Sequence, residues 1–170
     1  DVWGAAVLDE EGGFDLEDEI EKAGLSQQVR LRGRYARTQD VFPNYALATL
    51  TSYREGLPVF LLEAMAYGMP LISFDVDTGP RDLIMPGVNG YLVDPFDYSE
   101  YAQRMGQLMD DIELRRAFSV SSKRAAQNFG EDAVYPQWKA LINGLCAGGA
   151  AMANAGDAAA TCADGAVTIG

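Results

Sequence analysis

Short apolar runs alternate with amphipathic segments along most of the chain. Four of the runs are predicted as buried strands: residues 2–8, 46–52, 71–74 and 91–93. Five segments with apolar residues at helical spacing are predicted as helices: residues 14–23, 58–66, 97–110, 111–128 and 131–146. Strands that alternate with helices favour an α/β fold, in which a parallel sheet carries helices on both faces.

Shorter elements and a tail complete the prediction. Residues 29–33 suggest a short strand that ends in a turn at Gly33, residues 40–45 a short helix, and residues 78–84 a short helix. From residue 147 the chain is rich in alanine and glycine and has few large apolar side chains to bury. We therefore expect one Rossmann-like domain over residues 1–146 and a disordered tail over residues 147–170.

The segment 52–66 combines two acids with a predicted strand-to-helix junction. Gly56 permits a tight turn and Pro58 suits the first position of a helix, where its missing N–H costs nothing. This leaves Glu55 in the loop and Glu63 about a turn and a half into the helix. Free N–H groups at the helix start attract an anion, and carboxylates accept hydrogen bonds from hydroxyls. The junction therefore suits a sugar phosphate, at the carboxyl end of a parallel strand where α/β sheets bind ligands.

Composition narrows the possible chemistry. The 170 residues include no histidine, which excludes histidine bases, Ser-His-Asp triads and histidine metal sites from this sequence. A net charge of −12 argues against nucleic acid and acidic lipid as partners, so a bound phosphate must depend on local amides and arginines. Two cysteines without metal-ligand spacing argue against a disulfide scaffold and favour a reducing cytoplasm. No apolar run reaches the roughly 20 residues that span a bilayer.

Several ordered motifs resemble family 4 retaining glycosyltransferases of the GT-B fold. Residues 55–70 resemble the E-x7-E signature of that family, residues 72–84 its following segment, and residues 89–95 its Asn-Gly turn and strand. The second segment is most similar to bacterial enzymes of teichoic-acid, capsule or exopolysaccharide synthesis. The resemblance covers residues 2–146 and implies the donor-binding C-terminal half of such an enzyme, without its first strand and helix.

The resemblance implies a role for each matching position. Glu55 is the expected catalytic residue and contacts the transferred sugar, and Glu63 accepts hydrogen bonds from the ribose. Backbone amides near the sugar and diphosphate come from Gly56, Leu57, Val59 and Phe60. Gly33, Arg34 and Tyr35 are expected to border the nucleobase. The family needs no metal and no cofactor; a nucleotide diphosphate sugar, with UDP as the expected nucleotide, is the donor substrate.

The implied reaction is transfer of a hexose or N-acetylhexosamine to a cell-envelope glycan or its lipid-linked precursor. The acceptor, and any contact with the inner face of the membrane, would then depend on an N-terminal domain outside these residues. Two other readings stay open: a nucleotide-sugar-binding module without turnover, or a non-hydrolysing sugar-nucleotide epimerase. Asp75 and Asp77 form a D-x-D motif that also occurs at manganese sites, but a loop acid and turn former is the preferred interpretation.

Overall fold

The computed structural model describes residues 1–3 and 15–153. Its α-helices are α1 (Leu16–Lys22), α2 (Val59–Ala66), α3 (Pro80–Leu83), α4 (Tyr98–Asp110), α5 (Ile112–Ala126) and α6 (Glu131–Ala153). Its strands are β1 (Ala48–Leu50), β2 (Leu71–Phe74) and β3 (Gly90–Val93), and its short 3₁₀ helices are η1 (Thr38–Asp40), η2 (Phe42–Asn44) and η3 (Gln127–Phe129).

The three strands form one parallel sheet in the order β1-β2-β3. Ala48 pairs with Leu71, and Leu71 pairs in turn with Gly90. All four residues of the central strand β2 are buried, which explains why its sequence is a continuous apolar run and does not alternate. The parallel α/β fold predicted from the sequence is confirmed.

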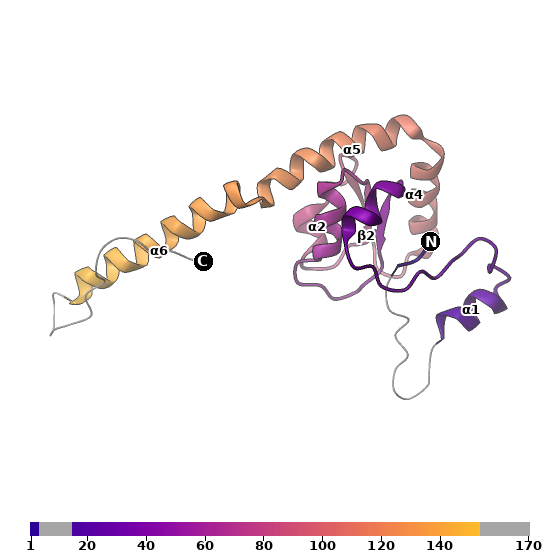
Figure 1. Cartoon of the computed structure of the whole chain (residues 1–170), viewed down its shortest axis with the longest axis horizontal. Coiled ribbons are helices and arrows are strands. Elements are labelled where there is room, and N and C mark those ends of the chain that lie inside the picture. The colour runs from indigo at the N-terminus through magenta and orange to yellow at the C-terminus, as the bar shows by residue number, and fades with distance from the viewer. Residues whose placement is uncertain (4–14, 154–170) are drawn as a thin grey trace.

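Helices cover both faces of this sheet, and Figure 1 shows α2 and α4 on opposite sides of β2. Successive residues of β2 point to opposite faces, so Leu71 and Ile72 enter different apolar clusters. The cluster on the α2 side includes Leu61, Ala64, Met65, Leu71 and Leu83. The cluster on the α4 side includes Ile72, Phe74, Val93, Tyr101 and Leu108. The sheet is thereby fixed between two layers of helices.

Tyr101 of α4 ties two of the strands together. Its ring is buried and its hydroxyl donates to the carbonyl oxygens of Leu50, at 3.3 Å, and Ile72, at 3.2 Å. These acceptors lie on β1 and β2. Because the phenol is out of water, burial raises the pKa of Tyr101 to about 12.

The N-terminal part differs from the sequence prediction in its details. The strand predicted over residues 2–8 lies mostly outside the described residues, and Val2 forms a single bridge to Leu31. The strand predicted over residues 29–33 is reduced to that bridge. The short helix predicted over residues 40–45 is present as η1 and η2, two separate turns of 3₁₀ helix.

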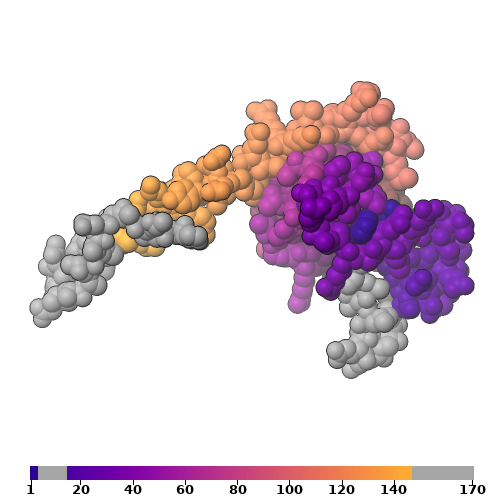
Figure 2. All heavy atoms as spheres, viewed as in Figure 1, coloured from indigo at the N-terminus to yellow at the C-terminus, as the bar shows by residue number. Residues whose placement is uncertain are grey.

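The C-terminal helix is longer than predicted. Helix α6 continues to Ala153, past residue 146 where the sequence pattern ended it. Trp138 and Leu141, two of its large apolar residues, are 60% and 54% exposed. The reason is visible in Figures 1 and 2, where α6 runs away from the sheet and so has no core to pack against along most of its length.

We predict that Tyr101→Phe lowers the free energy of unfolding by about 1 kcal/mol at neutral pH, because a buried hydrogen bond is lost. The pKa of Tyr101 rises from 10.0 in the unfolded chain to about 12 in the fold. The stabilisation from this raised pKa is therefore complete below about pH 10 and is lost as the pH rises towards 12, a change of roughly 2–3 kcal/mol. Urea unfolding at pH 7 to 11.5 checks both effects.

Wild-type protein should thus lose stability more steeply than Tyr101→Phe above pH 10. Tyr135→Phe is the matched control, since Tyr135 is 51% exposed. Parallel stability curves for wild type and Tyr101→Phe would contradict the assignment.

Candidate functional site

The candidate site lies where the three parallel strands end. Because the strands run in the same direction, the segments that follow them meet at one edge of the sheet. These segments are residues 51–58 after β1, residues 75–79 after β2 and residues 94–97 after β3. Glu55 belongs to the first of them, as the sequence predicted.

Helix α2 begins one residue later than expected. Pro58 is the cap residue before the helix and not its first residue, with extended backbone angles of φ −74° and ψ 92°. Its carbonyl accepts from Leu61, at 2.9 Å, and from Leu62, at 3.2 Å. The N–H groups of Val59 and Phe60 precede the first intrahelical bond and so have no acceptor within the helix. Two donors and the positive end of the helix dipole therefore lie at this end of α2.

Glu63 projects from the side of α2 that does not face the core. Leu61, Ala64 and Met65 fill the buried side, while Glu63 is only partly buried. Glu63 and Val59 are four residues apart, so they share one face of the helix, and Val59 is 58% exposed. The Glu63 carboxylate therefore lies on the same face of α2 as Val59, the first residue of the helix.

Tyr35 packs against the apolar cluster that contains the buried side of α2. Burial raises the pKa of the Tyr35 phenol, and the negative charge of Glu63 raises it further. Phe42 contacts the rings of both Tyr35 and Phe60, with centroid distances of 5.6 and 5.8 Å. The structure thus brings the loop of Gly33, Arg34 and Tyr35 next to α2, although some 25 residues separate them in sequence. Gly33, at φ 71°, and Arg34 are exposed at this loop.

Glu55 is held by the loop that follows β2. The Thr78 hydroxyl donates to the backbone carbonyl of Glu55. Gly79, at φ 87°, lies so close to the Gly56 carbonyl and the Pro58 ring that a Cβ atom would come within 2.6 Å of Pro58 Cδ. The sequence suggested that Thr78-Gly79-Pro80 caps and starts a helix or contacts a ligand, and it did not predict this contact with the loop of Glu55. The sequence signal for the contact between the two loops is Gly79, directly before a proline, because a residue without a Cβ lets its backbone approach that of Gly56.

The acidic side chains of the candidate site are available for hydrogen bonding. Among the described residues, neither Glu55 nor Glu63 is in an ion pair, and both are partly exposed. Gly56 and Leu57 are exposed beside Glu55. An unpaired carboxylate is an acceptor that can bridge two adjacent hydroxyls. That Glu55 and Glu63 converge on one hollow stays a prediction.

The D-x-D acids are engaged with an arginine. Arg81 of α3 forms ion pairs with Asp75 and, at 3.6 Å, with Asp77. The hydrogen bond and charge of Asp75 raise the pKa of Arg81. In the described part of the chain no group of three or more possible ligands is placed to hold a metal ion.

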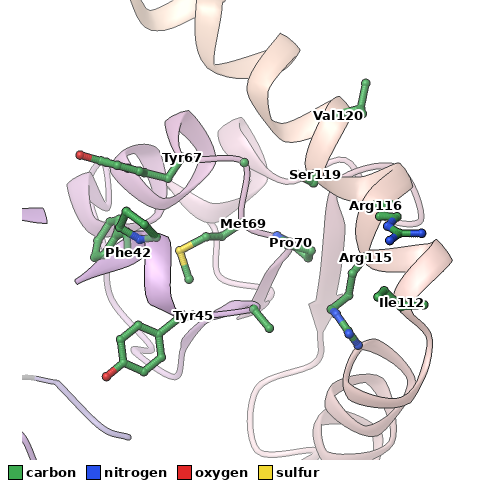
Figure 3. Close-up of a pocket in the computed structure, with 13 residues that line it drawn as sticks. Phe42, Tyr45, Tyr67, Met69, Pro70, Ile112, Arg115, Arg116, Ser119 and Val120 are labelled. Atoms are coloured by element: carbon green, nitrogen blue, oxygen red, sulfur yellow. The ribbon is translucent and has the colours of Figure 1, made fainter. Parts of the chain in front are cut away.

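The described cavities lie away from this edge. The one drawn in Figure 3 has a volume of about 510 Å³ and lies at the opposite, amino-terminal end of β2, where Pro70 precedes the strand. Tyr45 and Tyr67 border it on one side, and Arg115 and Arg116 of α5 on the other. Two more cavities, of about 660 and 420 Å³, are lined by α4 with the start of α5 and by α1 with residues 26–32. None of these three is lined by Glu55 or Glu63.

Comparison with known proteins identifies the family. Residues 2–125 match the model of the family "Glycosyl transferases group 1". The chain belongs to this family. The resemblance drawn from the E-x7-E segment and its neighbouring motifs is thereby confirmed.

Curated relatives of this group 1 chain include two glycosyltransferases and an exopolysaccharide phosphotransferase. An exopolysaccharide phosphotransferase of Streptomyces coelicolor is 32% identical over 76% of this chain. An amylovoran biosynthesis glycosyltransferase of Erwinia amylovora is 27% identical over 81%, and a poly(ribitol-phosphate) alpha-N-acetylglucosaminyltransferase of Staphylococcus aureus is 28% identical over 73%. The chain spans only 14%, 38% and 25% of the lengths of these three proteins.

A solved group 1 relative supports the fold. The pneumococcal O-GlcNAc transferase GtfA, crystallised with UDP and GlcNAc, is 28% identical and superposes with a TM-score of 0.67. The match covers 77% of this chain and 27% of that one. The GT-B fold implied by the sequence motifs is confirmed for the part of the protein that the chain represents.

We predict that Gly79→Ala destabilises the protein by about 2–4 kcal/mol, because the backbone at φ 87° and ψ −75° costs alanine roughly 1–3 kcal/mol and the added Cβ overlaps the Gly56 carbonyl and Pro58. Gly87→Ala is the matched control: Gly87 has φ 75° but nothing within 4 Å of the added Cβ. It should show the strain alone, about 1 kcal/mol. Chemical denaturation measures both variants, and equal losses would show that the two loops do not approach as described.

We predict that Glu63→Gln lowers the pKa of Tyr35. A negative charge beside a phenol disfavours phenolate, so its removal should shift the Tyr35 titration towards lower pH. NMR of the Tyr35 ring carbon, assigned with Tyr35→Phe, measures the shift. Glu113→Gln, on an exposed turn of α5, should leave it unchanged. An unaltered Tyr35 titration in Glu63→Gln would separate these residues and remove the spatial basis of the site.

Proposed function

We propose that this chain is the donor-binding part of a retaining glycosyltransferase that uses a UDP-sugar. The transferred group is a hexose or N-acetylhexosamine, and the acceptor is a cell-envelope glycan or its lipid-linked precursor. The observation that carries the proposal is that Phe42 contacts both Tyr35 and Phe60, so that the loop of residues 33–35 lies beside α2, the helix that carries Glu63. Support comes from the family and from a relative that was crystallised with UDP and GlcNAc.

Each part of the donor has chemically suitable residues in this arrangement. The nucleobase lies along Gly33, Arg34 and Tyr35, and the ribose hydroxyls donate to Glu63. The diphosphate takes the N–H groups at the start of α2, because a helix N-terminus stabilises an anion. Glu55 accepts from hydroxyls of the sugar. Fixed amides suit this task in a chain of net charge −12, where the overall field repels phosphate.

The proposed reaction breaks the bond between the anomeric carbon and the leaving phosphate oxygen. The acceptor hydroxyl oxygen forms the new bond on the same face of the sugar, and its proton passes to the departing diphosphate. UDP and the glycosylated acceptor are the products. This route uses no histidine, which the chain lacks, and requires only that the donor be oriented and its developing charge stabilised.

A second function is a nucleotide-sugar-binding module without turnover. It is favoured by the fact that this chain matches 38% or less of the length of each of the three curated relatives described above, so that the whole activity of those relatives depends on more than the matched part. The epimerase alternative lacks a specific supporting observation. Binding of UDP-GlcNAc without release of UDP would indicate the module, and steady release of UDP the transferase.

Location is part of the proposal. In the described part of the chain, no helix is both long enough and apolar enough to cross a membrane. We propose a cytoplasmic location, which agrees with the sparse cysteines and with a nucleotide sugar as donor.

We predict that Glu63→Ala weakens binding of UDP by about ten- to a hundredfold, because a charged hydrogen-bond partner of the ribose contributes roughly 1.5–3 kcal/mol. Glu55→Ala should leave the affinity for UDP within about twofold of wild type. We expect wild type to bind UDP-GlcNAc more tightly than UDP, and Glu55→Ala should bind both ligands with equal affinity. Calorimetric titration of the 170-residue chain with both ligands measures these effects.

Glu100→Ala is the control for loss of a partly buried acid, since Glu100 pairs with Arg104 on α4. It should bind both ligands as wild type does. If Glu63→Ala binds UDP with unchanged affinity, Glu63 is not in the donor site and the proposed function fails at its central residue.

A further inference from the structure

Aromatic rings gather at the carboxyl edge of the sheet. Phe74 ends β2 and is buried, whereas Tyr53, Phe96 and Tyr98 are 67%, 58% and 66% exposed. The ring centroids of Tyr53 and Phe96 lie 5.6 Å apart. The centroid of Phe74 lies 6.2 Å from that of Phe96 and 6.1 Å from that of Tyr98. We call Tyr53, Phe96 and Tyr98 the aromatic platform. Its members follow different strands, Tyr53 after β1 and the other two after β3, so only the folded sheet brings them together.

Phe96 holds its place at an energetic cost. Its φ of 69° is the one positive φ among the described non-glycine residues. For a bulky side chain this conformation costs roughly 1–2 kcal/mol, which glycine would avoid. Local hydrogen bonds fix the turn, with Tyr98 N–H donating to the Phe96 carbonyl at 2.9 Å. The Phe96 ring contacts Tyr53, Phe74 and Tyr98 and still stays more than half exposed, and strained backbone positions of this kind concentrate at functional sites.

The aromatic platform adjoins the proposed donor site. Tyr53 is two residues before Glu55 on the same loop, and Phe74 directly precedes Asp75. A transferase must bring its acceptor to the edge that holds the donor sugar. The platform is therefore at the edge where an acceptor would arrive. The inference rests on the proposed function, because only a transferase brings an acceptor to this edge.

The charges around the platform select against an anionic occupant. Asp94 and Asp97 lie on the loop of Phe96, and Asp75 follows Phe74. Of the nearby cations, Arg81 is paired with Asp75 and Asp77, which leaves Arg54 beside Tyr53. Acids thus outnumber bases at this surface, and the whole chain is strongly acidic. A phosphate-containing polymer would be repelled, whereas a neutral chain of sugars would not.

We propose that Tyr53, Phe96 and Tyr98 form a stacking surface for the pyranose rings of a neutral glycan acceptor. The faces of aromatic rings carry partial negative charge, so they attract the C–H groups that line one side of a pyranose. Neighbouring rings tilted against one another, by 39° between Tyr53 and Phe96, offer contact to more than one sugar. This distinguishes the chain from its relative named for poly(ribitol-phosphate), whose polymer is charged.

The test is saturation-transfer NMR on the 170-residue chain with three hexasaccharides: chitohexaose and maltohexaose, which are neutral, and the acidic hyaluronan hexasaccharide. We expect transfer to at least one neutral sugar. Phe96→Gly and Tyr53→Ala should each weaken that binding about three- to tenfold. Tyr135→Ala, at an exposed ring of α6, is the matched control and should bind as wild type does.

A structural role and a binding role of Phe96 have different consequences. Phe96→Gly relieves the backbone strain but loses the ring contacts, so its thermal midpoint should stay close to that of wild type while sugar binding falls. Tyr53→Ala gives a second readout that does not alter a strained residue. Both variants should keep their affinity for UDP within twofold, which shows that the platform is separate from the donor site. If wild-type protein does not bind UDP, the proposed function fails, and this result leaves the sugar-binding test of the platform unaffected.

Four results would overturn the inference. These are absence of transfer to both neutral sugars, neutral-sugar binding that survives both substitutions, hyaluronan binding at least as tight as that of the neutral sugars, and aromatic signals that shift on dilution without sugar. The last result would assign the platform to association between copies of the chain.

Discussion

The contact between the loops after β1 and β2 is the constraint on which the candidate site depends. Parallel pairing brings these loops to one edge, but pairing alone leaves them free to splay apart. Gly79 allows its backbone to meet Gly56 and Pro58, and Thr78 bonds to the Glu55 carbonyl. The path of the chain into α2 is thereby fixed. The direction of the amides at the start of α2 follows from that path.

The elements that follow strong local patterns could be predicted from the sequence. β2 is a continuous apolar run, α4 and α5 have clear apolar periodicity, and Asn89-Gly90 marks the start of β3. Pro58 was predicted within one position, because proline suits both the cap and the first turn. The family motifs added the candidate acids, which no local pattern distinguishes from ordinary helix carboxylates.

Contacts between segments that are distant in sequence were beyond the reach of such patterns. The contact of Phe42 with both Tyr35 and Phe60 depends on the path of the loop before η1, and periodicity carries no information on that path. The left-handed backbone of Phe96 could not be expected, because propensity assigns such positions to glycine or asparagine. Trp138 and Leu141 have helical spacing in the sequence, but spacing predicts burial only where a partner surface exists.

Two chemically different surfaces thus meet at one edge of the sheet. On the α2 side, fixed dipoles and unpaired carboxylates suit a charged and hydroxyl-rich ligand despite the net charge of −12. On the α4 side, exposed rings surrounded by acids suit a ligand with little charge. The β2 strand separates the two sides, because Leu71 faces the α2 layer and Ile72 the α4 layer. The alternation of a single buried strand therefore assigns the start of α2 and the aromatic platform to opposite faces of one sheet, at the edge where the strands end.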